Sequence, residues 1–175
     1  MPRISRLEKD QVDPESAKIY DTYQQERGNV PNMFRTVAHR PEILRTMIAH
    51  FRAVMNTGTV PQKLKELAIV RTSQLNHCEY CLASHTVLAR RHGWSDEQLA
   101  DLANFRNRSD FTDADKAALE LAERTTLNPN GVDDAFWSEL RKHYDEGEII
   151  ELLAAIGLFN YFNRFNNALH MEPTK

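Results

Sequence analysis

The sequence predicts an all-α protein, a bundle of about eight helices, and three observations lead to this expectation. Apolar residues recur every three to four positions through most of the 175 residues, which is typical of helices that bury one face. Residue pairs that cap helix N-termini stand ahead of many of these segments. No segment alternates apolar and polar residues as a strand does, and the chain holds no glycine-rich phosphate loop and no internal repeat.

The first part of the chain predicts an irregular arm and three helices. Residues 1–12 show no periodic pattern, and we expect them to form an N-terminal arm ahead of a single domain over residues 13–175, since this length suits one hydrophobic core. An aspartate followed by proline opens a helix over about 13–26. A short helix near 32–38 follows, and a proline starts a longer one over about 41–55.

The middle of the chain carries two pairs that resemble capping boxes, in which an N-cap side chain and one three residues later bond each other's backbone amides. Thr59 with Gln62 predicts a helix that continues to Leu75. Asn76 with Glu79 predicts the next helix, which the glycine after position 92 ends.

Further capping signals predict four helices in the remainder of the chain. The four helices begin, in chain order, at a serine–glutamine pair, a threonine, an aspartate and an aspartate–glutamate pair. We expect these helices at about 95–105, 112–126, 133–143 and 145–170.

The only two cysteines, Cys78 and Cys81, lie three positions apart, and His85 follows four positions later. On the predicted helix over 76–92, with Cys78 in its first turn, such residues are neighbours with Cβ atoms roughly 5–6 Å apart. They share the apolar, inward face of this helix, whereas Tyr80 is predicted to point away from it. The segment therefore predicts two reactive thiols with a base beside them.

Composition narrows the class of protein. The net charge of −3 and the scattered basic residues give no reason to expect nucleic acid as a partner. The N-terminus lacks the apolar core of a secretory signal, and no stretch reaches the roughly 18 apolar residues of a membrane span. We therefore expect a cytoplasmic protein without a membrane partner. In that reducing compartment, two closely spaced thiols indicate catalysis or metal binding rather than a structural disulfide.

The spacing Glu66-x11-Cys78-x2-Cys81-x3-His85, within an all-helical chain, resembles that of the AhpD-like alkylhydroperoxidases, which belong to the carboxymuconolactone decarboxylase superfamily. The stretch VPQKLKELAIVRTSQLNHCEYCLASHTVLARRHGWSDEQLADL also looks like the core of that family. The later stretch EIIELLAAIGLFNYFNRFNNAL looks like the closing helix of its longer, peroxidase-related members. The resemblance covers about residues 30–170 and implies the AhpD-like helical fold.

The resemblance implies an antioxidant enzyme, a peroxidase that reduces hydroperoxides with its thiols. By position, Cys81 attacks the peroxide and becomes a sulfenic acid, Cys78 condenses with it to a disulfide, and Glu66 and His85 form a proton relay. It implies no bound cofactor and no metal, because an external dithiol, such as a protein-bound lipoyl group, restores the reduced state. It also implies a homo-oligomer, a trimer or a hexamer.

One position departs from the family pattern. Some members carry a histidine between the cysteines that joins the relay, and here Tyr80 stands at that position. A phenol with a pKa near 10 is a poor proton carrier at neutral pH. We therefore expect a shorter relay or a weaker activity.

The residues alone leave the roles of the two sulfurs open. The thiolate is the nucleophile, and a helix N-terminus favours an anion most in its first turn, which selects Cys78 as the more ionised sulfur. His85 is closer to Cys81 and can take its proton. The resemblance selects Cys81 as the sulfur that attacks the peroxide, and we adopt that assignment.

Three other interpretations of the cysteine segment stay open. In the first, Cys78, Cys81 and His85 supply three ligands to a zinc ion, and Glu66 or His77 completes the tetrahedron. The protein would then be a non-enzymatic zinc or redox-sensing module. Carboxymuconolactone decarboxylation, the sister activity of the family, needs no cysteine pair. The third interpretation is purely structural: the cysteines are two small, buried apolar residues without a chemical role.

Several polar residues outside the motif also carry expectations. Arg71 lies inside an apolar arc and needs an acidic or carbonyl partner if it is buried. His50 lies among apolar residues, which indicates a core or interface position, and His77 is expected to be exposed. A polar stripe on the last predicted helix either lines a subunit contact or a site, or is solvated: Asn160, Asn163, Arg164 and Asn167.

Overall fold

The structure of the protein, a computed structural model, describes residues 2–174, and all regular structure in that range is helical. The prediction of an all-α fold is therefore confirmed. Within this range the chain forms nine α-helices, one in each predicted helical segment, where a bundle of about eight was expected, together with three short 3-10 helices. None of the helices over residues 2–174 combines the length and the apolar character needed to cross a bilayer.

The helices follow the predicted segments along the chain. The α-helices are α1 (Pro14–Arg27), α2 (Asn32–Val37), α3 (Pro41–Asn56), α4 (Gln62–Leu75), α5 (Glu79–Arg91), α6 (Asp96–Ala100), α7 (Asp113–Leu127), α8 (Asp134–Leu140) and α9 (Glu146–Leu169). The 3-10 helices are η1 (Lys9–Gln11), η2 (Leu102–Asn107) and η3 (Pro129–Gly131).

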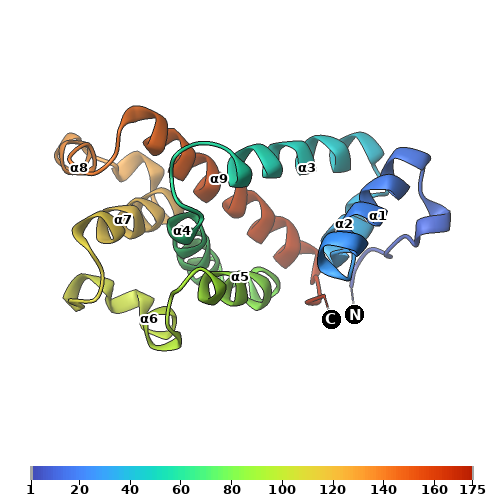
Figure 1. The fold of residues 1–175 in the computed structure, drawn as a ribbon, viewed down its shortest axis with the longest axis horizontal. Helices are drawn as coiled ribbons and strands as arrows, with labels where there is room; N and C mark the ends of the chain where they lie inside the picture. The colour runs from blue at the N-terminus through green and yellow to red at the C-terminus, as the bar shows by residue number, and fades with distance from the viewer. Residues whose placement is uncertain (1, 175) are drawn as a thin grey trace.

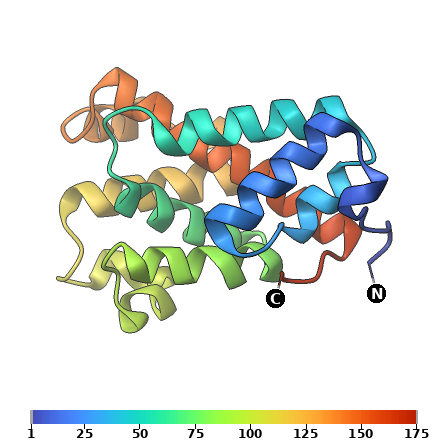
Figure 2. The same ribbon diagram turned by 45° about the vertical axis from the view of Figure 1, so that its right-hand side comes forward.

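Helices α4 and α9 form the centre of the molecule. Helix α9 runs along much of its length, and α4 packs against α5, α7 and α9 (Figure 1). Helices α1 and α2 pack on α3 at the end where both chain termini lie, and α7 and α8 lie at the other end (Figure 2). The two ends of the chain are thereby brought to the same side of the molecule.

The buried apolar side chains form two clusters. One lies between α4, α7, α8 and the first half of α9, and includes Leu67, Leu121 and Leu152. The other lies between α1, α2, α3, the start of α5 and the second half of α9, and includes Phe34 and Phe159. Both cysteines belong to this second cluster. Since each buried apolar side chain contributes about 1.5–3 kcal/mol, packing on α9 holds the cysteine segment in place.

Most of the predicted helix starts are confirmed. Asp13 accepts hydrogen bonds from two backbone amides of α1. Ser95 with Gln98 opens α6 as a capping box, and Asp145 with Glu148 opens α9 in the same way. A threonine also opens α7 as expected. These signals depend on neighbours in the sequence, so the sequence reports them directly.

Two predicted helices end earlier than expected. The segment over 95–105 divides into α6 and η2, which buries Leu102 and Phe105. These residues lie three positions apart, the repeat of a 3-10 helix, so the tighter helix buries both. The segment over 133–143 ends as an α-helix at Leu140.

The capping box predicted at Thr59 and Gln62 is wrong. No side chain caps the start of α4. Instead, Glu151 of α9 accepts hydrogen bonds from the backbone amides of Thr59, at 2.7 Å, and Val60, at 3.0 Å. This approach requires Gly58, because a Cβ there would lie 2.0 Å from the Glu151 carboxylate. A carboxylate from a distant helix replaces the local cap, and local sequence does not reveal it.

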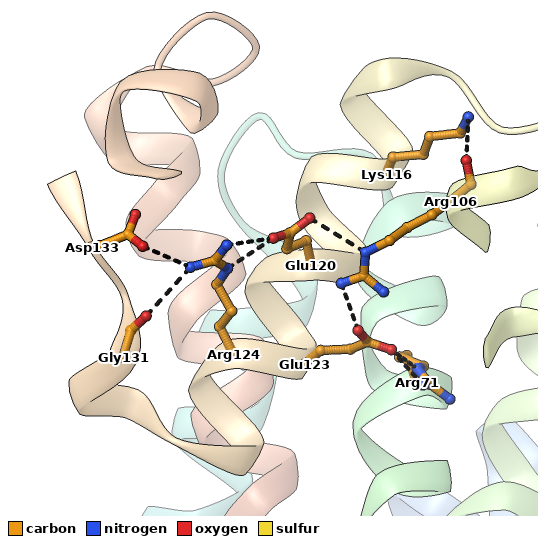
Figure 3. A network of polar contacts seen from close by, with 8 residues as sticks. All are labelled: Arg71, Arg106, Lys116, Glu120, Glu123, Arg124, Gly131 and Asp133. Carbon is orange, nitrogen blue, oxygen red and sulfur yellow. Dashed lines mark hydrogen bonds and ion pairs between the residues drawn. The ribbon is translucent and has the colours of Figure 1, made fainter. Parts of the chain in front are cut away.

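A network of ion pairs joins α7 to α4, η2 and the turn before α8 (Figure 3). The expectation that Arg71 needs a partner is confirmed: its Nε donates to Glu123 Oε1 at 2.8 Å. Arg106 pairs with the other oxygen of Glu123 at 2.8 Å, and Arg124 pairs with Glu120 at 2.7 Å. The network fixes how α7 lies against its neighbours.

Candidate active site

The two cysteines lie at the turn between α4 and α5. Asn76 closes α4, and its Nδ2 donates to the Thr72 carbonyl at 3.1 Å. His77 adopts the left-handed conformation, with φ of 50°, and so redirects the chain. Cys78 is then the N-cap of α5, and its amide donates to the Ser73 carbonyl at 3.0 Å.

The capping box predicted at Asn76 and Glu79 is therefore wrong, and this moves both sulfurs relative to the helix end. The Asn76 side chain serves the end of α4 and not the start of α5. Cys78 precedes the first helical residue, and Cys81 is the third residue of α5. Both thus lie where the free amides and the helix dipole favour an anion.

Both cysteines are free thiols and both are buried. Cys78 is 0% exposed and Cys81 is 3% exposed. A cavity of about 90 Å³ adjoins the pair, and the residues that line it include Cys81 but not Cys78. A small oxidant that enters this cavity therefore meets Cys81, with Cys78 behind it. Alongside polar residues such as Ser84, His85 and Asn166, the residues that line the cavity include five aromatic side chains: Phe34, Phe51, Tyr80, Phe159 and Phe162.

The two thiols differ in acidity. The hydrogen bond from the Cys81 thiol lowers the pKa of Cys78 to about 7; the backbone amides of Cys81 and Tyr80 and the Asn163 side chain add to this effect, and burial opposes it. The pKa of Cys81 is raised, because its thiol donates that hydrogen bond, because it is buried, and because the Cys78 thiolate lies beside it. Cys78 therefore holds the thiolate of the resting pair. This agrees with the expectation from the sequence, although the neighbouring thiol is a larger cause than the helix end.

Glu66 and His85 form a buried pair near the thiols. Glu66 Oε2 accepts a hydrogen bond from His85 Nδ1 at 2.8 Å, and the two side chains are 3% and 12% exposed. The Phe159 ring packs edge-on against the imidazole, with ring centroids 4.5 Å apart. His85 also lines the cavity beside Cys81. Because Nδ1 is held by the carboxylate, Nε2 is the nitrogen left to exchange a proton.

Helix α9 brings two asparagines to the cysteines. Asn166 Nδ2 donates to Cys81 Sγ at 3.4 Å. Asn163, one turn earlier, is fully buried; its Nδ2 donates to Ser73 Oγ at 3.2 Å, and its Oδ1 accepts from Asn76 Nδ2 at 3.1 Å. Asn166 was absent from the residues predicted for the site. The signal that could have found it is its spacing from Asn163, which places both amides on one helix face.

The polar stripe predicted on this helix divides into two parts. Asn163 is buried beside the cysteines, and the half-buried Asn160 accepts a hydrogen bond from Asn76 at 2.9 Å. These two residues support the site-wall interpretation. Arg164 and Asn167 are exposed, as the solvated interpretation expects.

Tyr80 does not point away from the inward face as the wheel predicted. It is 8% exposed, and its hydroxyl accepts a hydrogen bond from the Met33 amide at 3.1 Å and bonds Thr174 Oγ1 at 3.3 Å. Burial raises the pKa of Tyr80, so this phenol keeps its proton. The prediction failed because the helix α2 region and the C-terminal residues cover this side of α5. Tyr80 therefore fastens both ends of the chain to the cysteine helix.

Two other histidines carried predictions. His77 is exposed, as predicted. His50 is also exposed, so a place in the core of the chain is wrong for it, and its place at an interface stays a prediction. Over residues 2–174, no three histidine, cysteine, aspartate or glutamate side chains are grouped so as to hold a metal ion.

The four residues predicted for the site come together in the structure. Cys78 and Cys81 lie close enough to shift each other's pKa, Glu66 is bonded to His85, and Cys81 and His85 share one cavity. Their catalytic roles stay predictions, which the geometry makes specific enough to test.

Comparison with known proteins gives consistent similarities. A family model described as the carboxymuconolactone decarboxylase family matches residues 41–124. The chain is 33% identical to the uncharacterized protein YdfG of Bacillus subtilis (strain 168) over 113 residues, which cover 64% of this chain and 77% of YdfG. It is 38% identical to the uncharacterized protein YnjA of Escherichia coli (strain K12) over 107 residues, 61% of this chain and 58% of YnjA.

A solved structure shares the fold over nearly the whole chain. It is an alkylhydroperoxidase AhpD core, an uncharacterized peroxidase-related protein from Ralstonia eutropha JMP134. The two structures agree with a TM-score of 0.90 at 26% sequence identity, and the match covers 99% of this chain and 93% of that chain.

Fold and site together define an all-α, AhpD-like protein with a buried dithiol. The chain belongs to the carboxymuconolactone decarboxylase family, within the superfamily that includes the AhpD-like proteins, as its similarity to YdfG and the family model show. All four residues predicted for the site lie within the stretch that the family model matches.

Proposed function

We propose that the protein is a thiol-dependent hydroperoxide reductase, an antioxidant enzyme in which Cys78 and Cys81 cycle between dithiol and disulfide. One observation carries the proposal: Cys81 lines a cavity that His85 also lines, and the buried Cys78 lies beside Cys81. Peroxide reduction by two thiols needs a sulfur that meets the oxidant, a second sulfur that bonds to it, and a group that moves protons. Similarity to a peroxidase-related protein supports the same class of reaction.

In the first step the Cys81 sulfur attacks the terminal oxygen of the hydroperoxide. The Cys81 proton passes to the Cys78 thiolate along the hydrogen bond that joins them. A sulfur–oxygen bond forms as the oxygen–oxygen bond breaks, and the electron pair of the broken bond leaves on the alkoxide. His85, which is hydrogen-bonded to Glu66, acts as the general acid and gives a proton to the alkoxide, which leaves as an alcohol.

In the second step Cys78 attacks the sulfenic acid on Cys81. The disulfide forms, the sulfur–oxygen bond breaks, and the hydroxide takes the Cys78 proton and leaves as water. The two sulfurs have together lost two electrons, and the peroxide has gained them. A dithiol from outside, such as a protein-bound lipoyl group, reduces the disulfide by exchange, and one of the released protons returns to His85.

Turnover of tert-butyl hydroperoxide by the purified protein, with dihydrolipoamide as the reductant, tests this proposal. The Cys81→Ser variant should lose turnover, and the Cys78→Ser variant should stop at a sulfenic acid on Cys81 that dimedone labels. No other cysteine is present, so each labelled thiol is assigned without ambiguity. Full activity in both variants would show that the dithiol is not the reactive group.

Two accompanying properties need separate measurements. We propose that the reductant is a dithiol, so glutathione should support turnover less well than dihydrolipoamide. We also propose a homo-oligomer of three or six chains. Light scattering on the purified protein gives the mass that decides the second point, and a monomer at working concentration would contradict it.

Two alternatives have distinct consequences. Decarboxylation, the reaction in the name of the family, uses no thiol, so a decarboxylase would keep its activity in the Cys78→Ser and Cys81→Ser variants. A zinc module would retain metal: stoichiometric zinc on the two thiols, in protein purified without chelator, would overturn the peroxidase proposal.

A further inference from the structure

The cavity wall contains a polar atom that the proposed reaction has not used. Asn166 is 1% exposed and lines the cavity together with Cys81. Its Oδ1 is buried and has no hydrogen-bond partner among the described residues. Only one other side-chain atom between residues 2 and 174 shares this condition, Arg6 Nε, and Arg6 does not line this cavity. A buried acceptor without a partner is costly, so the free oxygen indicates a ligand that donates to it.

The two asparagines of α9 differ in this respect. Both ends of the Asn163 amide are bonded to protein groups, Ser73 on one side and Asn76 on the other. Asn166 bonds only through Nδ2, which donates to Cys81 Sγ. That bond fixes the orientation of the amide and leaves Oδ1 as its unpartnered atom, on a residue that lines the cavity. The residue thus joins the reactive sulfur and a vacant acceptor within one rigid, planar group.

We propose that Asn166 positions the hydroperoxide for attack by Cys81, with Oδ1 accepting a hydrogen bond from the terminal O–H of the substrate. This inference rests on the proposed peroxidase function. In a hydroperoxide the only O–H is on the oxygen that the sulfur attacks. The same amide therefore holds the nucleophile through Nδ2 and the attacked oxygen through Oδ1. The substrates that it selects are hydroperoxides, and dialkyl peroxides, which lack this O–H, are excluded.

The hydrogen bond persists through the chemical step. Cys81 Sγ bonds to the terminal oxygen while the oxygen–oxygen bond breaks, and the electron pair leaves on the alkoxide, which His85 protonates. The proton on the terminal oxygen stays there and becomes the proton of the sulfenic acid. Asn166 Oδ1 accepts from that O–H before and after the attack, while Nδ2 stabilises the negative charge that the Cys81 sulfur carries once it has lost its proton and before it attacks.

The test compares two oxidants that differ in the O–H group. In the Cys78→Ser background only Cys81 reacts, and the rate constants with tert-butyl hydroperoxide and with methyl methanethiosulfonate are measured. The second reagent is small and modifies thiolates but has no O–H to donate. The ratio of the two rate constants isolates the contribution of Oδ1, because loss of the Nδ2 donor slows both reactions.

Three added substitutions separate the two halves of the amide. Asn166→Leu should slow both reactions and lower the hydroperoxide-to-thiosulfonate ratio about tenfold or more, the effect of one buried hydrogen bond. Asn166→Asp keeps an acceptor oxygen but loses the donor, so it should slow both reactions and leave the ratio within about twofold. Asn167→Leu makes the same change at an exposed neighbour outside the cavity and should leave the ratio unchanged.

The outcomes distinguish this inference from the function on which it rests. An unchanged ratio in Asn166→Leu, or an equal fall in Asn167→Leu, would overturn the role of Asn166 and leave the peroxidase proposal intact. A Cys78→Ser parent that reacts with the thiosulfonate but with no hydroperoxide would overturn both. If circular dichroism shows that Asn166→Leu does not fold, Asn166→Ala replaces it, and the same fall in the ratio is expected.

Discussion

Lys65 and Glu66 are neighbours on α4, and both bury a charged side chain, at 1% and 2% exposure. The groups that bond the two charges are different. Lys65 Nζ donates to the carbonyls of Val54, at 2.8 Å, and Thr57, at 2.9 Å, and pairs with Glu151 at 2.9 Å. An ammonium has three donors, and all three are used. Lys65 therefore closes the turn between α3 and α4 against α9.

Glu66 has a single hydrogen-bond partner among the described residues, His85 Nδ1. Imidazole is the side chain that most readily exchanges protons near neutral pH, and this one lines a cavity with a reactive sulfur. The Lys65 ammonium is bonded to two backbone carbonyls and to the Glu151 carboxylate, an arrangement that stabilises the fold. The Glu66 carboxylate is bonded only to His85, which lines a cavity, and this arrangement suits proton transfer.

The largest expected effect falls on the fold, at Lys65. Lys65→Met leaves the Glu151 carboxylate without its cation and two carbonyls without a donor, so we expect a loss of about 3–5 kcal/mol in the free energy of unfolding. Urea denaturation measures it. The hydroperoxide reaction of the folded fraction should keep its rate. Lys63, two positions earlier, is exposed, so Lys63→Met is the matched control. An equal loss of unfolding free energy in Lys63→Met would show that the buried bonds of Lys65 are not the cause.

The next effect falls on the rate, at Glu66. Glu66→Gln keeps a hydrogen bond to His85 but removes the negative charge beside the imidazole, so we expect the hydroperoxide reaction to slow about 100-fold, or about 2.7 kcal/mol in the barrier. Stability should change by less than about 1 kcal/mol. Stopped-flow kinetics over a range of pH measure the first, and an unchanged pH–rate profile would remove Glu66 from the relay. Glu79→Gln, on the exposed side of α5, is the control.

A smaller effect concerns the acidity of the thiols. The pKa of Cys78 lies at about 7, below the value of about 8.5 for free cysteine, so its thiolate is present above this pH and is lost as the pH falls through it. Ultraviolet absorbance should show one thiolate with a midpoint near 7, and the second thiol should stay protonated. Cys81→Ala removes the largest cause of the shift and should raise the midpoint by about 1.5 pH units, or about 2 kcal/mol. A midpoint that stays near 7 would show that the helix N-terminus dominates.

The smallest effect is expected in the ion-pair network on α7. Arg106 is 49% exposed, and Arg71 continues to pair with Glu123 when Arg106 is removed (Figure 3). Arg106→Gln should therefore cost less than about 1 kcal/mol by urea denaturation and leave the hydroperoxide rate unchanged. If Arg106→Gln lowered the free energy of unfolding as much as Lys65→Met does, exposure would not explain the difference between the Arg106 ion pair and the buried Lys65 ion pair.

The fold was predictable because its signals are local or repeat along the chain, and so was the placement of Cys78, Cys81 and His85 within one segment. Glu66 was predicted only from its spacing to Cys78 in the family resemblance. Helix periods and caps such as Asp145 with Glu148 depend on residues a turn apart. The two failed caps, at Thr59 and Asn76, share a different cause. In one the amides are bonded by Glu151 from a distant helix, and in the other the side chain serves the preceding helix.

The surroundings of the thiols were less predictable, because distant segments supply them. Helical periodicity predicts that Tyr80 points outward, but in the structure α2 and Thr174 cover it. Asn166 reaches Cys81 from 85 positions away. Its spacing from Asn163 places it on the same helix face but does not show that this face contacts Cys81. The low pKa of Cys78 depends on how the two sulfurs lie toward each other, which spacing alone does not define.

The cavity draws on two parts of the chain. Glu66, Cys78, Cys81 and His85 lie within the stretch 41–124 that the family model matches, whereas much of the wall comes from outside it, including Met33, Phe34, Phe159 and Phe162. Substitutions outside that stretch can therefore change the shape of the cavity and leave these four side chains untouched. If the proposed function holds, such changes would alter which hydroperoxides fit without altering the reaction.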